Sequence, residues 1–101
     1  MSVSCDGWSN VPHTGDRTCR CGSWQQHWIN FADKGKVWPK KCCVYGCGND
    51  ADRGLHIHQG NGPEYIIPGC RSCNGRSSDD KFSIKPGTHL VSANKSKTCE
   101  A

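Results

Sequence analysis

The sequence predicts a small α+β domain that a hydrophobic core alone would not hold together. Leu, Ile, Val and Phe supply only 14 of the 101 residues, near the fraction at which chains fail to bury a core. Nine cysteines, four tryptophans and twelve glycines accompany them, which is typical of small domains held by metal ions or disulfides. One helical pattern and several short strand patterns in the sequence indicate that the domain contains both helix and sheet. We expect a flexible N-terminal arm over residues 1–16, docked through Trp8, and a single domain over residues 17–101.

A short helix is predicted over residues 23–32. Trp24, Trp28 and Phe31 follow one another at spacings of four and three residues, which places three aromatic rings on one stripe of a helix. Ser23 is a suitable N-cap because its hydroxyl can accept a hydrogen bond from the first turn. We expect the stripe to pack into the core.

Two β-hairpins are predicted in the second half of the chain. The first joins residues 55–58 to residues 64–67, because these apolar runs flank a glycine-rich turn. The second joins residues 82–84 to residues 89–91 across a Pro-Gly turn. This second hairpin and the polar tail occupy residues 81–99.

The strongest chemical signal is an ordered set of four cysteines, Cys43, Cys47, Cys70 and Cys73. A Cx3C turn precedes a 22-residue insertion that can hold one hairpin, and a CxxC step follows. Two tight turns can each present two thiolates to one ion, and zinc prefers four soft ligands at tetrahedral corners. The neighbours Cys42 and Cys43 cannot easily serve the same tetrahedral site. We prefer Cys43 as the ligand, and Cys42 is the alternative.

Further runs accompany this cysteine frame: Gly-Leu-His-Ile at 54–57 and Tyr-Ile-Ile-Pro-Gly at 65–69. Over residues 42–76 the chain thereby resembles the treble-clef zinc module of HNH-type endonucleases. The resemblance implies a zinc knuckle, a hairpin, and a CxxC at the start of a helix, with His56 as the general base. Leu55, however, stands where that family has a metal-binding Asp or His, and no histidine directly follows the CxxC. A base without that catalytic metal would lose most of its transition-state stabilisation, so nuclease activity is an alternative function.

A second metal site is predicted from the remaining cysteines and a histidine. The favoured ligands are Cys19, Cys21, His56 and Cys99. Such a site would tie the aromatic helix and the tail to the central hairpin. His27 is the alternative fourth ligand, and a disulfide between Cys99 and Cys19 or Cys21 would tie the same ends without a metal.

Charge and hydropathy favour a soluble protein with an ordinary surface. The net charge is +4, and two thiolate-rich zinc sites would reduce it to about +1, the balance of an ordinary solvated surface. No segment is apolar enough to span a membrane, and residues 1–11 lack the apolar stretch of a signal peptide. Both observations favour reduced thiols and an intracellular, cytoplasmic location.

These observations predict a non-enzymatic binding module with one or two structural zinc ions. Four thiolates leave no open coordination position for a substrate. The expected partner is nucleic acid or protein, and no membrane contact is expected. The first alternative is a divergent HNH-like nuclease that uses His56 as general base, and the second is a disulfide-rich extracellular domain.

Overall fold

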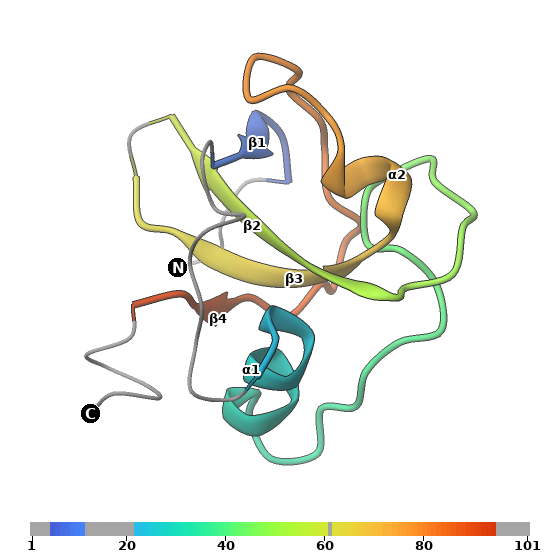
Figure 1. Ribbon diagram of the computed structural model, residues 1–101, viewed down its shortest axis with the longest axis vertical. Helices are drawn as coiled ribbons and strands as arrows, with labels where there is room; N and C mark the ends of the chain where they lie inside the picture. Colours follow the sequence, from blue (N-terminus) through green and yellow to red (C-terminus); the bar gives the residue numbers. More distant parts are fainter. Residues whose placement is uncertain (1–4, 12–21, 61, 95–101) are drawn as a thin grey trace.

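A computed structural model describes residues 5–11, 22–60 and 62–94 (Figure 1). These residues form a four-stranded sheet and two helices, in the chain order β1 (Trp8–Asn10), α1 (Trp24–Phe31), β2 (Arg53–Gln59), β3 (Tyr65–Gly69), α2 (Arg71–Asn74) and β4 (Val91–Ser92). The strands lie in the order β1-β2-β3-β4, and every neighbouring pair is antiparallel. The predicted α+β class is confirmed.

The central hairpin of β2 and β3 forms as predicted. Leu55 pairs with Ile67, and His56 pairs with Ile66. Successive side chains along a strand point to opposite faces, so Leu55 and Ile67 share one face while His56 and Ile66 share the other. Leu55 and both isoleucines are completely buried, and His56 is 5% exposed. Both faces of the hairpin are therefore covered.

Helix α1 covers one face and begins where the sequence predicts. Its N-cap is Ser23, whose hydroxyl accepts a hydrogen bond from the Gln26 amide at 3.0 Å. The aromatic stripe is buried only in part, because Trp28 is 2% exposed whereas Phe31 is 38% exposed. His27, rather than Phe31, completes the buried side of the helix. The expectation that the whole stripe enters the core is wrong at Phe31, where the last turn is half open to solvent.

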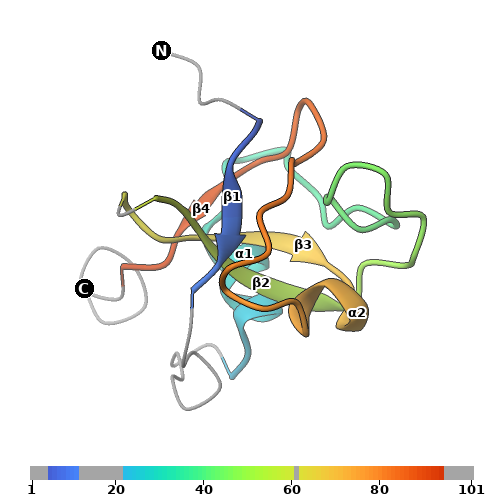
Figure 2. The same ribbon diagram turned by 90° about the horizontal axis from the view of Figure 1, so that it is seen from above.

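The opposite face of the β2–β3 hairpin is covered by the Trp8 side chain of the edge strand β1 and by the segment 82–84 (Figure 2). Trp8, which is 1% exposed, exchanges two backbone hydrogen bonds with Phe82, at 3.0 and 2.7 Å. Trp8 therefore docks as predicted. Residues 8–10, which were expected to belong to an arm, instead form strand β1 of the sheet.

The predicted second hairpin does not form. Its turn is present, since the Thr88 amide donates to the Lys85 carbonyl at 3.2 Å. Its flanking runs, however, pair with other segments: Phe82 bridges to Trp8, and Val91 pairs with Ile66 on β3. The two runs lie toward opposite edges of the sheet, so they satisfy their backbone groups there rather than with each other.

Candidate metal centre

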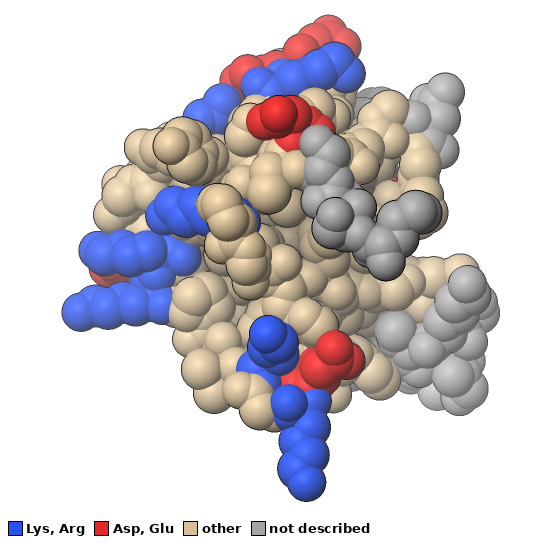
Figure 3. Space-filling view, turned by 180° about the vertical axis from the view of Figure 1, so that it is seen from behind, with Lys and Arg blue, Asp and Glu red and all other residues tan. Residues whose placement is uncertain are grey.

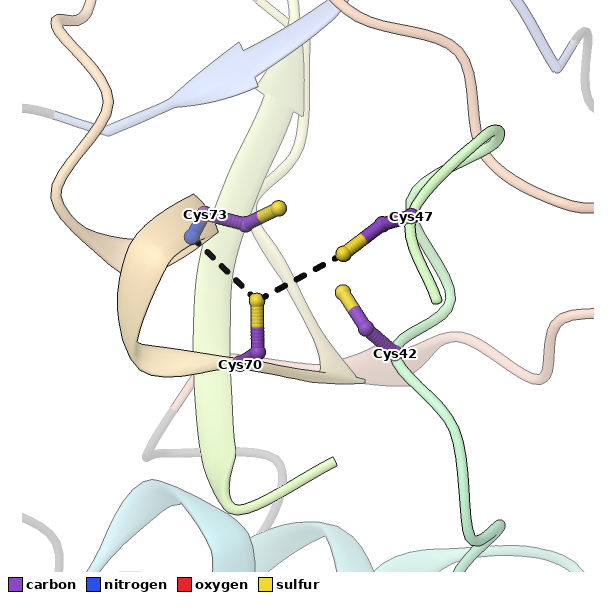
Figure 4. Close-up of side chains that lie close together, drawn as sticks. All are labelled: Cys42, Cys47, Cys70 and Cys73. Atoms are coloured by element: carbon purple, nitrogen blue, oxygen red, sulfur yellow. Dashed lines mark hydrogen bonds between the residues drawn. The ribbon is translucent and has the colours of Figure 1, made fainter. Parts of the chain in front are cut away.

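Four cysteine sulfurs converge between a loop and helix α2 (Figure 4). They belong to Cys42, Cys47, Cys70 and Cys73, and all lie within 4.8 Å of one another. Figure 4 shows the Cys42 and Cys47 side chains pointing from the loop toward those of Cys70 and Cys73. Cys42, Cys70 and Cys73 are buried, and Cys47 is half-buried. This donor set is close enough to bind one metal ion.

The loop that carries Cys42 and Cys47 is a tight turn closed by backbone hydrogen bonds. The Cys42 amide donates to the Asn49 carbonyl at 2.9 Å, and the Cys47 amide donates to the Val44 carbonyl at 3.1 Å. Gly46 takes a φ of 83°, a left-handed conformation that favours glycine. These contacts bring the two sulfurs of the turn to the same side.

The other two sulfurs come from the start of α2. Cys70 is the N-cap of this helix, and its sulfur accepts a hydrogen bond from the Cys73 amide at 3.4 Å. The side-chain amide of Asn49 donates to the same sulfur at 3.6 Å. Gly75 ends the helix. Asn49 was not predicted as part of the site. Its position two residues after Cys47 could have indicated a polar side chain close to the cysteine sulfurs.

The structure places Cys42, and not the preferred Cys43, among the four sulfurs. The two cysteines are consecutive in a non-helical stretch, where neighbouring side chains turn to opposite sides. Their amides fix this arrangement by donating to different partners, Cys42 to the Asn49 carbonyl and Cys43 to the Pro68 carbonyl. The Cys43 thiol lies beside the Thr88 hydroxyl instead, and that hydroxyl donates to the Lys85 carbonyl at 2.6 Å. The preference for Cys43 is corrected to the alternative, Cys42.

Burial and hydrogen bonds act in opposite directions on these thiols. Burial raises the pKa of the Cys70 thiol, but hydrogen bonds from the Cys73 amide and from Asn49 outweigh it and lower that pKa from 9.0 to about 7. Burial raises the pKa of the Cys42 thiol and of the Cys73 thiol above 9.0. Cys70 is therefore the first of these three thiols to ionise as pH rises. Cys42 and Cys73 lose their protons when a metal ion binds to their sulfurs.

Arg76 supplies a positive charge beside the cluster. Its guanidinium hydrogen-bonds with the Cys73 sulfur, and this contact raises the pKa of Arg76. The same group lies 3.2 Å from the Asp80 carboxylate and 5.7 Å from the centre of the Phe82 ring. Four thiolates around a divalent ion carry a local charge of about −2, which Arg76 would partly offset.

Asn10 is a supporting residue that sequence reasoning missed. It lies on β1, is 8% exposed, and donates from its side-chain amide to the carbonyl oxygens of Cys73 and Arg76. It thereby joins the first strand to the end of α2. No local pattern could have revealed this contact, because 63 residues separate Asn10 from Cys73.

The second predicted metal site falls mainly outside the described residues, which exclude Cys19, Cys21 and Cys99. His56 is described. Its Nε2 atom lies 2.6 Å from a carboxylate oxygen of Glu64, and its side chain is 4% exposed. This nitrogen is therefore engaged with a carboxylate at the covered face of the hairpin.

His27, the alternative ligand, lies in the same layer as His56. Its Nε2 atom is 2.8 Å from the Ser92 carbonyl oxygen on β4. The Trp24 ring packs edge-on against both histidines, with ring centres 5.1 Å from His27 and 4.9 Å from His56. Both imidazoles thus contribute to the contact between α1 and the sheet.

Comparisons with known proteins return no relative. No protein-family model, curated protein or solved structure matches the chain. The resemblance to HNH-type endonucleases therefore rests on the residues alone. None of the six cysteines in the described part of the chain forms a disulfide, and no described helix is both long and apolar enough to cross a membrane. Fold and site together define a small α+β domain with a four-cysteine cluster that can bind a metal ion.

Proposed function

We propose that this chain is a non-enzymatic binding module whose fold depends on one structural zinc ion held by Cys42, Cys47, Cys70 and Cys73. The convergence of four sulfurs from two separate turns carries this proposal. The sulfurs of Cys47 and Cys70 lie 3.7 Å apart. Tetrahedral zinc with bonds of about 2.3 Å would separate its sulfurs by roughly 3.8 Å, so the spacing of this pair fits zinc, and the other sulfurs lie within 4.8 Å.

The order of the elements around the cluster supports a treble-clef arrangement. A turn at 42–47 precedes the β2–β3 hairpin, and α2 begins directly after Cys70. The resemblance to HNH-type endonucleases implies the same order. Zinc in this position would join the turn to the helix and so replace apolar contacts that the small core lacks.

A binding role is favoured over catalysis by the donor set and by the setting of His56. Four thiolates fill a tetrahedral shell and leave no position for water or substrate. His56, the alternative general base, is 5% exposed and has Nε2 against Glu64, while Leu55 before it is completely buried. A base that activates water needs access to that water. The partner of such a module is a protein or a nucleic acid.

The adjacent cysteines provide a matched test of the zinc site. Cys42→Ser is expected to lower the zinc content of the purified chain by one equivalent, whereas Cys43→Ser keeps it at the wild-type value. Elemental analysis measures this difference, and circular dichroism during chelation measures the dependence of the fold on the ion. Equal zinc content in the two variants, or an unchanged spectrum after zinc removal from the wild type, would contradict the proposal.

A further inference from the structure

A hollow of about 320 Å³ lies between the segment 36–41 and the turn at 85–89. Figure 2 shows these two stretches side by side at the top of the view, which is the rear of Figure 1. Ligand-binding pockets begin at roughly this size. The hollow contains no member of the four-cysteine cluster. It is therefore a second feature of the molecule, separate from the metal centre.

The lining of the hollow is mainly apolar. Its lining residues include Trp28, Pro39, Pro68 and Pro86. Val37 extends this apolar surface outward, and its 81% exposure is the highest among the large hydrophobic side chains of the described residues. A single exposed valine has little meaning alone, but here it adjoins a concave apolar surface. The apolar area thus continues beyond the hollow itself.

Three lysines border this apolar surface: Lys36, Lys41 and Lys85. No Asp or Glu is among the described residues that line it. Lys41 pairs with Asp50 at 2.9 Å, but both side chains are more than half exposed, so a ligand carboxylate could replace this weak contact. The Lys85 ammonium donates to the Cys47 carbonyl at 2.9 Å, which holds its charge in place. Figure 3 shows Lys and Arg side chains toward the margins of the rear face, with Asp or Glu beside several of them and mainly uncharged surface between.

We propose that this hollow docks an acidic peptide segment of a partner protein. An apolar side chain of the segment occupies the hollow, and flanking carboxylates contact Lys36, Lys41 and Lys85. A chain segment fits better than a compact small molecule, because the exposed Val37 side chain would stay uncovered by a ligand confined to the hollow. The lysines, spread around the border, match a ligand with several separated negative charges.

An oligonucleotide fits this surface less well than an acidic peptide. Sequence-tolerant binding of single strands uses open aromatic faces on which bases stack. Trp28 and His89 carry the only aromatic rings among the described lining residues. Trp28 is 2% exposed, with its indole N–H donating to the His89 carbonyl at 2.9 Å, and the His89 side chain is 19% exposed. The surface offers positive charge without a stacking platform.

This docking surface rests on the proposed zinc module, because the metal-binding turn holds two of its walls. The Cys43 amide donates to the Pro68 carbonyl at 3.0 Å, and the Lys85 amide donates to the Cys43 carbonyl at 2.8 Å. Loss of the turn would therefore separate Pro68 from Lys85. The docking test must be made on the full zinc-loaded chain, with zinc content and circular dichroism measured on the same sample.

The probe is a short fluorescein-labelled peptide in which adjacent leucine and phenylalanine residues are flanked by glutamates. Fluorescence anisotropy is expected to show saturable binding that weakens as salt is added. Lys36→Glu is expected to weaken binding about fivefold to tenfold, because an attraction becomes a repulsion. Val37→Asp is expected to weaken it by at least as much. Lys40→Glu is the matched control, since this exposed lysine has the same charge and does not line the hollow, and its effect is expected to stay below about twofold.

Each other result of this titration contradicts the docking proposal. No saturable binding to a chain with intact zinc content and circular dichroism would overturn it while leaving the zinc module standing. If a peptide with glutamine in place of glutamate bound as tightly as the glutamate peptide, the lysines would have no role in binding. Tighter binding of a single-stranded oligonucleotide that Lys36→Glu abolishes would assign the surface to nucleic acid. In nuclear magnetic resonance spectra, peptide-induced amide shifts should centre on residues 36–43 and 85–89, and shifts confined elsewhere would also overturn it.

Discussion

The side-chain amide of Asn10 on β1 donates a hydrogen bond to the carbonyl oxygen of Cys73 at 2.9 Å. The same amide reaches the carbonyl oxygen of Arg76 at 3.0 Å. The Cys73 carbonyl also accepts a hydrogen bond from the Arg76 amide at 3.2 Å, so Asn10 adds a second donor there and joins the end of α2 to β1. The first strand of the sheet thus stabilises the helix that presents Cys70 and Cys73.

Asn10→Ala is expected to lower the free energy of unfolding of the zinc-loaded chain by about 1–3 kcal/mol, because it removes the hydrogen bonds to the Cys73 and Arg76 carbonyls, at about 0.5–1.5 kcal/mol each. It should also weaken zinc binding, since α2 is less firmly held. Urea unfolding and competition with a zinc-sensitive dye measure the two effects. Asn30→Ala is the control, an exposed asparagine on α1, with an expected change within about 0.5 kcal/mol. Equal effects of the two variants would refute the role assigned to Asn10.

Zinc binding at about pH 8 is expected to release at least two protons, those of Cys42 and Cys73, because metal ligation requires thiolates. Burial raises the pKa of both thiols in the folded chain, and in an unfolded chain their ordinary pKa of 9.0 also leaves them mainly protonated at pH 8. Cys70, whose pKa in the folded chain is about 7, adds a third proton only where zinc binding also drives folding, since its pKa in the unfolded chain is 9.0. Below pH 7 this thiol must also lose its proton, so zinc affinity should fall more steeply with further acidification.

Calorimetric titrations in buffers of different ionisation enthalpy count these protons. The lowered pKa of Cys70 favours the folded state above its unfolded pKa of 9.0, and this contribution disappears as pH falls through about 7. An apparent binding enthalpy that is independent of the buffer at about pH 8 would contradict the predicted proton release.

Gly54→Ala is expected to destabilise the fold by about 1–3 kcal/mol through overpacking. A Cβ atom at Gly54 would lie 2.5 Å from the carbonyl carbon of Trp24 and 2.6 Å from the amide nitrogen of Gln25, both in backbone that cannot easily move. Gly48→Ala is the matched control, since nothing lies within 4 Å of a Cβ there. Thermal unfolding compares the two, and a similar midpoint for both variants would show that α1 does not approach β2 this closely.

His56→Ala is expected to destabilise the fold by about 2–3 kcal/mol, because it removes a buried ring and its Glu64 contact. His58→Ala, on the same strand but half-buried, should cost less. Unfolding is measured beside cleavage of supercoiled plasmid in the presence of magnesium, where the wild type should be inactive. A His56→Ala variant as stable as the wild type that loses a measurable cleavage activity would instead support the nuclease alternative.

The local features of this fold follow from neighbouring residues. Ser23 caps α1 because a hydroxyl beside a helix start finds its partner three residues away. The turn between β2 and β3 forms because two apolar runs flank glycines that accept tight turns. Three cysteines of the cluster, Cys47, Cys70 and Cys73, were predicted from spacing, since a tight turn fixes the relative positions of residues close in the chain.

Contacts between distant segments required the tertiary structure. The choice of Cys42 over Cys43 depends on which carbonyl each amide reaches, and one of these, that of Pro68, belongs to another strand. The local sequence favours pairing of residues 82–84 with residues 89–91. In the structure Phe82 bridges to Trp8 on β1 and Val91 pairs with Ile66 on β3 instead. The sequence by itself determined the α+β class and the cysteine-rich chemistry, because composition and short-range spacing encode them. Only the tertiary structure decided which strands pair, which of two adjacent sulfurs faces the cluster and that Asn10 supports it, because those outcomes depend on the positions of backbone groups far apart in the chain.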